Sequence, residues 1–159
     1  MQELDASSII YGWDNYPIQQ FPPLWNWLAD QVSTELAITQ VAFEEVRNMS
    51  PDCADWLIEN YIDRKPITSE ILSLALIIKN ALGIEGDNYH SKGVGENDIL
   101  IIASAKISRV ELISDENRQN SLPRDLQKYK IPAVCHMDSV SVQCINFVDY
   151  IKQSNQVFI

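Results

Sequence analysis

The sequence predicts an α/β domain with a mainly parallel central sheet. Short apolar strands alternate with helical segments along the chain, and 159 residues are enough for one domain with its own core. The apolar share of 46% is typical of a globular chain and not of a disordered one. We see no internal repeat, low-complexity segment or second domain, so we expect one domain spanning residues 1–159.

The first elements follow from local chemistry. We expect a short strand over Leu4–Ile10, although Glu3 in front of it is a poor strand residue. An aromatic-rich loop then covers Tyr11–Phe21. The Pro22–Pro23 pair opens a helix over Leu24–Ser33, because a missing N–H costs nothing in the first turn.

The next segments continue the alternation of strand and helix. Leu36–Ile38 is the second expected strand, and Thr39 can cap a helix that runs through Arg47. Pro51 begins a short helix through Asn60, and a charged turn follows over 63–66. Thr68 or Ser69 then caps a longer helix over 70–82, which Gly83 ends before a loop over 83–95.

A buried helix is predicted over Asn97–Ile107, because this segment is apolar nearly all round. Asn97 suits the N-cap, and Asp98 suits the positive end of the helix dipole. The remaining expected elements are a strand over 110–114, a polar segment over 115–130, a strand over 131–135, an amphipathic helix over 142–154 and an edge strand over 157–159.

Charge and composition narrow the class of protein. The formal net charge of −10 counts against a general nucleic-acid binder, although acids gathered to hold divalent cations also lower the charge. Three cysteines without a CxxC spacing indicate reduced thiols in a cytoplasmic protein. The apolar run Ile71–Ile78 is too short to span a bilayer, and the first residues do not resemble a signal peptide. We therefore expect no association with membranes.

Acidic residues stand where a parallel sheet forms its sites. Such sites lie at the carboxyl ends of the strands, and hard divalent cations take oxygen ligands there. The acids at strand ends, at helix starts or beside a buried helix face are Asp5, Asp98, either Asp115 or Glu116, and either Glu44 or Glu45. Spacing alone leaves open whether they are metal ligands, helix caps or solvated charges.

Several segments resemble PIN-like domains, and more narrowly the single-domain VapC-type toxins of toxin–antitoxin pairs. The resemblance covers nearly the whole chain and rests on LDASSIIYGWDNYP, AFEEV, GENDILIIASA, LISDE and KIPAVC. It implies a three-layer α/β/α fold with a mainly parallel sheet. It also implies an RNA phosphodiesterase that depends on Mg²⁺ or Mn²⁺, with an antitoxin and a second copy of the chain as partners.

The resemblance also assigns site residues. The catalytic carboxylates implied by it are Asp5, Glu45, Asp98 and Glu116, with Glu44 and Asp115 as the neighbouring alternatives. Of these, Asp5, Asp98 and Glu116 would hold the metal, and Ser7 would lie near it. The implied reaction is in-line attack by a metal-bound water, leaving a 5′-phosphate.

The locally basic stretch 117–130 follows the fourth acid directly, so Arg118 and Lys128 could contact RNA phosphates. A solvated loop is the alternative interpretation of this stretch. For the whole chain, the alternative to a ribonuclease is a PIN-like binding module without catalytic activity, which the net charge and the glutamate at the fourth position favour.

Overall fold

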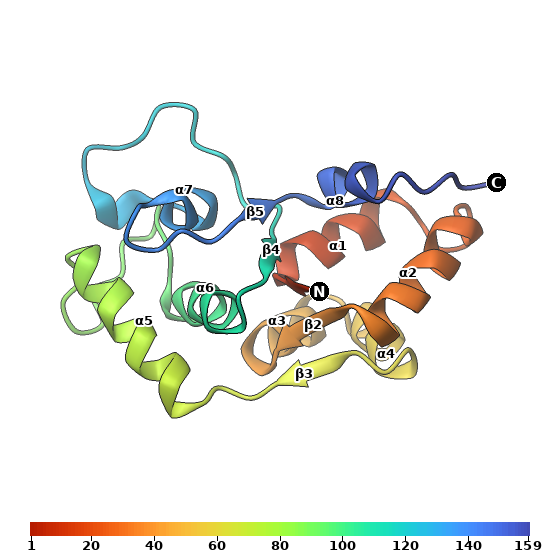
Figure 1. The fold of residues 1–159 in the computed structure, drawn as a ribbon, viewed down its shortest axis with the longest axis horizontal. Helices are drawn as coiled ribbons and strands as arrows, with labels where there is room; N and C mark the ends of the chain where they lie inside the picture. The colour runs from red at the N-terminus through yellow and green to blue at the C-terminus, as the bar shows by residue number, and fades with distance from the viewer.

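The computed structural model describes all residues 1–159 and has a five-stranded, all-parallel sheet between layers of helices (Figure 1). The strand order is β3-β2-β1-β4-β5. The strands are β1 (Gln2–Leu4), β2 (Leu36–Thr39), β3 (Asp63–Lys65), β4 (Glu111–Ile113) and β5 (Cys144–Ile145). The helices are α1 (Ala6–Asn15), α2 (Pro22–Thr34), α3 (Gln40–Met49), α4 (Pro51–Glu59), α5 (Ser69–Ala81), α6 (Glu96–Ser108), α7 (Ile131–His136) and α8 (Phe147–Ser154), with a short 3₁₀ turn, η1 (Leu126–Lys128). The predicted α/β/α architecture is confirmed.

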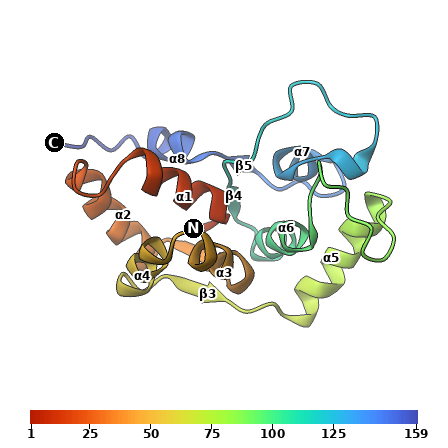
Figure 2. The same ribbon diagram turned by 180° about the vertical axis from the view of Figure 1, so that it is seen from behind.

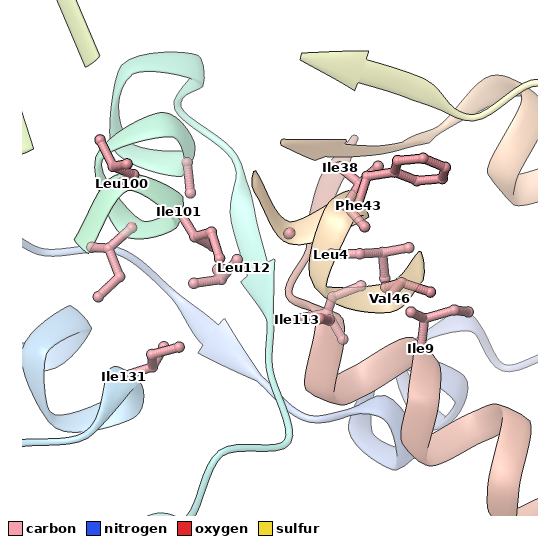
Figure 3. Packing of buried hydrophobic residues seen from close by; sticks show 14 of the residues in the cluster. Leu4, Ile9, Ile38, Phe43, Val46, Leu100, Ile101, Leu112, Ile113 and Ile131 are labelled. Carbon is pink, nitrogen blue, oxygen red and sulfur yellow. The ribbon is translucent and has the colours of Figure 1, made fainter. Parts of the chain in front are cut away.

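The two faces of the sheet pack against different helices. Successive side chains of a strand point to opposite faces, so Leu112 and Ile113 of β4 separate. Figure 3 shows Leu112 beside Ile101 of α6, whereas Ile113 lies with Leu4 on the side of α1 and α3. Both views place α5 and α7 beside α6, and α4 and α8 beside α3 and α1 (Figure 1, Figure 2). One continuous apolar core therefore runs through both layers.

Several helix starts are confirmed. The Thr39 hydroxyl accepts a hydrogen bond from the Ala42 N–H at 3.1 Å and caps α3. Thr68, and not Ser69, caps α5 by accepting from the Ile71 N–H at 3.2 Å. Prolines lie in the first turns of α2 and α4, as expected.

The strand expected over 4–10 is wrong beyond its first residue. β1 ends at Leu4, and α1 then runs through Asn15 into the segment predicted as a loop. The buried positions of α1 include Ala6, Ile9 and Gly12, which recur at the three-residue spacing of a helix face. A Cβ on Gly12 would lie 2.6 Å from the Phe147 ring, so a glycine lets α1 approach α8 closely.

The C-terminal third differs most from the prediction. Residues 131–135 lie in α7, because Pro132 occupies the first turn of a helix and not the middle of a strand. The helix expected over 142–154 is divided into β5 and α8, and the Asn146 side chain caps α8 by accepting from the Asp149 N–H at 2.8 Å. Residues 157–159 form no strand.

The charged turn expected over 63–66 is the edge strand β3, and it provides the partner of a buried acid. Glu3 in β1 is fully buried. Lys65 lies 3.2 Å from its carboxylate, and the hydroxyls of Ser104 and Ser108 each donate to it at 3.1 Å. These partners explain how a residue with poor strand propensity occupies the central strand. No helix in the structure has both the length and the apolar character needed to cross a bilayer.

Candidate active site

Two adjacent parallel strands end side by side at the centre of the sheet. Leu4 of β1 is in register with Ile113 of β4, and the Asp5 N–H donates to the Ile113 carbonyl at 2.9 Å. In the sheet, β2 and β3 lie on one side of β1, whereas β4 and β5 lie on the other side. This reversal of strand order is where open α/β sheets form their binding crevices. Asp5 and Ser114 are the first residues after the two strands.

The Asp5 carboxylate is held by two hydroxyl groups. Ser7 and Ser114 donate to the same oxygen, Oδ2, at 2.5 and 2.9 Å. The Ser7 hydroxyl in turn accepts from the Asp115 N–H at 2.9 Å. Asp5 occupies the N-cap position of α1, yet its side chain accepts no cap hydrogen bond, so the carboxylate points towards the strand ends. Ser7, predicted to lie near a metal, thus orients the first acid.

Burial changes the acidity of Asp5. The residue is only 2% exposed, and desolvation raises the pKa of its carboxyl to about 7, against the lowering effect of the Ser7 and Ser114 hydroxyls. Asp98 and Glu45 raise this pKa further through repulsion. Three acids from distant parts of the chain therefore lie within electrostatic range of one another.

Asp98 reaches this region from the start of α6. The predicted N-cap, Asn97, is wrong: Gly95 occupies that position, and its N–H donates to Asp98 Oδ2 at 2.9 Å. Asn97 instead donates from its amide to Glu45 Oε1 at 3.3 Å and connects α6 with α3. Burial raises the pKa of the Asp98 carboxyl, while the Gly95 N–H and the charge of Lys130 lower it.

The structure shows which of the two adjacent glutamates of α3, Glu44 or Glu45, faces the other acids, which the spacing of the sequence left open. Glu44 accepts from Gln40 at 2.8 Å and pairs with Arg47 at 3.5 Å along the outer side of α3. Glu45 faces the other acids: burial raises the pKa of its carboxyl, Asn97 lowers it, and Asp98 and Glu116 raise it. Glu45 is therefore the acid that α3 brings to the site.

Asp115 and Glu116 are separated in the same way. Asp115 Oδ1 accepts from the Phe147 N–H at 2.9 Å at the start of α8. Burial also raises the pKa of the Glu116 carboxyl, which the charge of Asp98 raises further and that of Lys130 lowers. We call Asp5, Glu45, Asp98 and Glu116 the acid cluster. Each of the four carboxylates that the sequence predicted thus lies within electrostatic range of at least two of the others.

The acid cluster has the chemistry of a hard-cation site. It offers only carboxylate oxygens, and burial or mutual repulsion raises the pKa of each carboxyl, a cost that a divalent cation would relieve. Yet no three acidic, imidazole or thiol side chains are placed around one point in the way that holds a metal ion. The donors fit Mg²⁺ or Mn²⁺ in type.

The predicted phosphate-binding residues lie outside the acid cluster. Arg118 donates to Asp149 at 3.0 Å on the surface of α8. Lys128 ends η1, and its carbonyl accepts from Gln119 at 3.0 Å. The basic residue that does act on the cluster is Lys130, immediately before α7. The sequence places Lys130 in the same basic stretch, but nothing local distinguishes it from its neighbours.

The order of the parallel strands agrees with the predicted PIN-like fold. The chain belongs to the family described as a domain of unknown function, DUF4411, whose model matches residues 3–158. Among curated proteins, none matches the sequence.

Solved structures share the fold at low sequence identity. The structure of PAE2754 from Pyrobaculum aerophilum is 12% identical with a TM-score of 0.56, over 98% of this chain and 90% of that one. FitAcB from Neisseria gonorrhoeae is 15% identical with a TM-score of 0.55, over 93% and 99%. VapBC2 from Rickettsia felis, bound to a DNA fragment from its promoter, is 14% identical with a TM-score of 0.50, over 81% and 96%. These likenesses confirm the predicted PIN-like fold.

Proposed function

We propose that this protein is a metal-dependent endoribonuclease of the VapC type, acting as the toxin of a toxin–antitoxin pair. The observation that carries the proposal is the acid cluster, which assembles carboxylates from residues 5, 45, 98 and 116 at the reversal point of a PIN-like sheet. The fold shared with FitAcB and VapBC2 supports the class of protein.

The residues around the cluster would keep its carboxylates in place during a reaction. Ser7 and Ser114 orient Asp5, the Gly95 N–H orients Asp98, and Asn97 orients Glu45. A bound Mg²⁺ or Mn²⁺ would lower the pKa of a water molecule and stabilise charge on the phosphate. Asp5, Asp98 and Glu116 would hold that cation, with Glu45 beside them. Attack on phosphorus would expel the 3′ oxygen, leaving a 5′-phosphate and a 3′-hydroxyl.

The test uses two pairs of adjacent acids as matched variants. Purified protein is incubated with total RNA and with a labelled RNA oligonucleotide, in Mg²⁺, in Mn²⁺ and in EDTA. We expect Glu45→Gln and Glu116→Gln to lower cleavage by about 100-fold or more, because losing even an indirect metal partner costs roughly 10- to 100-fold. Glu44→Gln and Asp115→Asn should retain most activity, because these side chains face away from the cluster.

The outcomes separate the candidate functions. The ribonuclease proposal is contradicted if the wild type, Glu45→Gln and Asp98→Asn cleave RNA equally. It is also contradicted if cleavage is the same with and without EDTA. RNA binding without cleavage would support the alternative, a non-catalytic binding module, which the dispersed carboxylate oxygens also favour. If the protein cleaves DNA or a phosphomonoester instead of RNA, the proposed cation site stands and the proposed substrate is wrong.

We also propose a cognate antitoxin and a second copy of the chain as partners, following the resemblance to VapC-type toxins. An antitoxin should cover or fill the acid cluster, and binding it should suppress cleavage. Light scattering on the purified protein tests the homodimer, and a monomeric mass at micromolar concentration would contradict it.

A further inference from the structure

One cation lies at the edge of the acid cluster. Lys130 immediately precedes α7 and is half-buried. The Val94 N–H donates to the carbonyl of Tyr129, the residue before Lys130, at 2.9 Å, and the N–H of the next residue, Gly95, donates to Asp98 Oδ2 at 2.9 Å. The backbone at Lys130 therefore lies beside the segment that holds Asp98. The lowering effect of the Lys130 charge on the pKa of the Asp98 and Glu116 carboxyls agrees with this placement.

Lys130 is near these acids but is not paired with any of them. The ion pairs of the structure involve the N-terminus, Arg47, Lys65 and Arg118. The Lys130 ammonium therefore lies more than 4.0 Å from every carboxylate oxygen, and its three N–H donors remain available to a ligand. This differs from Arg118, which is already occupied by Asp149.

The backbone at Lys130 is fixed to the segment that leads into α6. The Lys130 N–H donates to Gln119 Oε1 at 2.9 Å, and the carbonyl of the preceding Tyr129 accepts from the Val94 N–H at 2.9 Å. Gly93 packs directly on the segment 127–130, which we call the strap before α7: a Cβ on Gly93 would lie 1.8 Å from the Gln127 carbonyl oxygen. The residue before Lys130 and the Asp98 carboxylate are therefore hydrogen-bonded to two adjacent residues, Val94 and Gly95.

We propose that Lys130 binds a phosphate of the RNA substrate and positions it over the acid cluster. A polyanion approaching four carboxylates on a chain of net charge −10 is repelled, and a fixed cation at the cluster offsets part of that repulsion, in addition to any bound Mg²⁺ or Mn²⁺. A lysine ammonium is a compact charge with rotatable donors, which suits a single phosphate oxygen and carries no base preference. This inference rests on the proposed ribonuclease function and replaces Lys128 and Arg118 as the phosphate contact.

Binding is measured first, apart from catalysis. Fluorescence anisotropy follows a labelled single-stranded RNA oligonucleotide titrated with protein in EDTA, at several salt concentrations. We expect Lys130→Gln to weaken binding roughly tenfold, as for loss of one charge-assisted hydrogen bond, and to reduce the salt slope by about 0.7. Lys130→Arg should bind within about threefold of the wild type. Lys128→Gln, two residues away, is the matched control and should bind as the wild type.

Cleavage kinetics and thermal melting complete the test. With Mg²⁺, Lys130→Gln should raise KM roughly tenfold and change kcat less, because uniform binding is lost. A lower melting temperature with unchanged RNA affinity and KM would assign Lys130 a purely structural role and overturn the inference. If the wild type cleaves RNA, and Lys130→Gln binds and cleaves it equally well, this inference is refuted but the proposed function is not. A wild type that neither binds nor cleaves RNA refutes the proposed function as well.

Discussion

Asp5, the buried acid directly after β1, makes the stability of the protein depend on pH, and replacing it should remove its share of that dependence. Asp5 is 2% exposed, and its pKa is raised from 3.8 to about 7, first by desolvation and then by Asp98 and Glu45. Asp5→Asn keeps the shape of the side chain and an oxygen that can accept from Ser7 and Ser114, but it cannot ionise. The variant therefore isolates the charge.

The sign of the effect follows from proton binding. Between pH 3.8 and about 7 the folded state holds the Asp5 proton and the unfolded chain has released it. Stability therefore falls as pH rises through this interval. The contribution is fully present below the unfolded pKa and is lost above the folded one. The whole interval corresponds to about 4 kcal/mol, of which about 2 kcal/mol falls between pH 5.5 and 8. That is a large share of a typical unfolding free energy of roughly 5–15 kcal/mol.

Urea unfolding followed by tryptophan fluorescence measures this loss in EDTA at pH values from about 5.5 to 8. The lower limit keeps the protein above its isoelectric point of about 4.5. Across this pH range, the unfolding free energy of the wild type should fall by about 2 kcal/mol more than that of Asp5→Asn. Asp55→Asn, an exposed acid on α4, is the control and should parallel the wild type. If the unfolding free energies of the wild type and Asp5→Asn change in parallel with pH, the argument that burial holds the proton on Asp5 is refuted.

Two further substitutions test the contacts that support the sheet and the site. Lys65→Met should lower the free energy of unfolding by about 3 kcal/mol, because it leaves the fully buried Glu3 carboxylate with only two serine donors. A loss below about 1 kcal/mol in urea unfolding would contradict this. Gly93→Ala should cost roughly 1–3 kcal/mol, because its Cβ would overlap the Gln127 carbonyl. A wild-type melting temperature for that variant would show that the strap before α7 moves freely.

Local chemistry explains which parts of the fold the sequence predicts well. Thr39 and Thr68 begin helices because a hydroxyl satisfies a free N–H within three residues, which is a local interaction. The same locality explains the errors. Apolar residues in 4–10 and 131–135 suit a strand or a helix equally, and only packing on neighbouring elements selects the helix in α1 and α7.

The candidate acids could be selected from the sequence, because carboxylates at strand ends and helix starts are visible in it. The sequence by itself determined the residue types, the Thr39 cap of α3 and the general alternation of strands and helices that yields a parallel sheet. The tertiary structure alone decided that Glu45 and Glu116, and not their neighbours, face Asp98, and that Lys130 lies beside them. The reason is physical: pairing of β1 with β4 joins residues more than 100 positions apart, and no local pattern encodes that register.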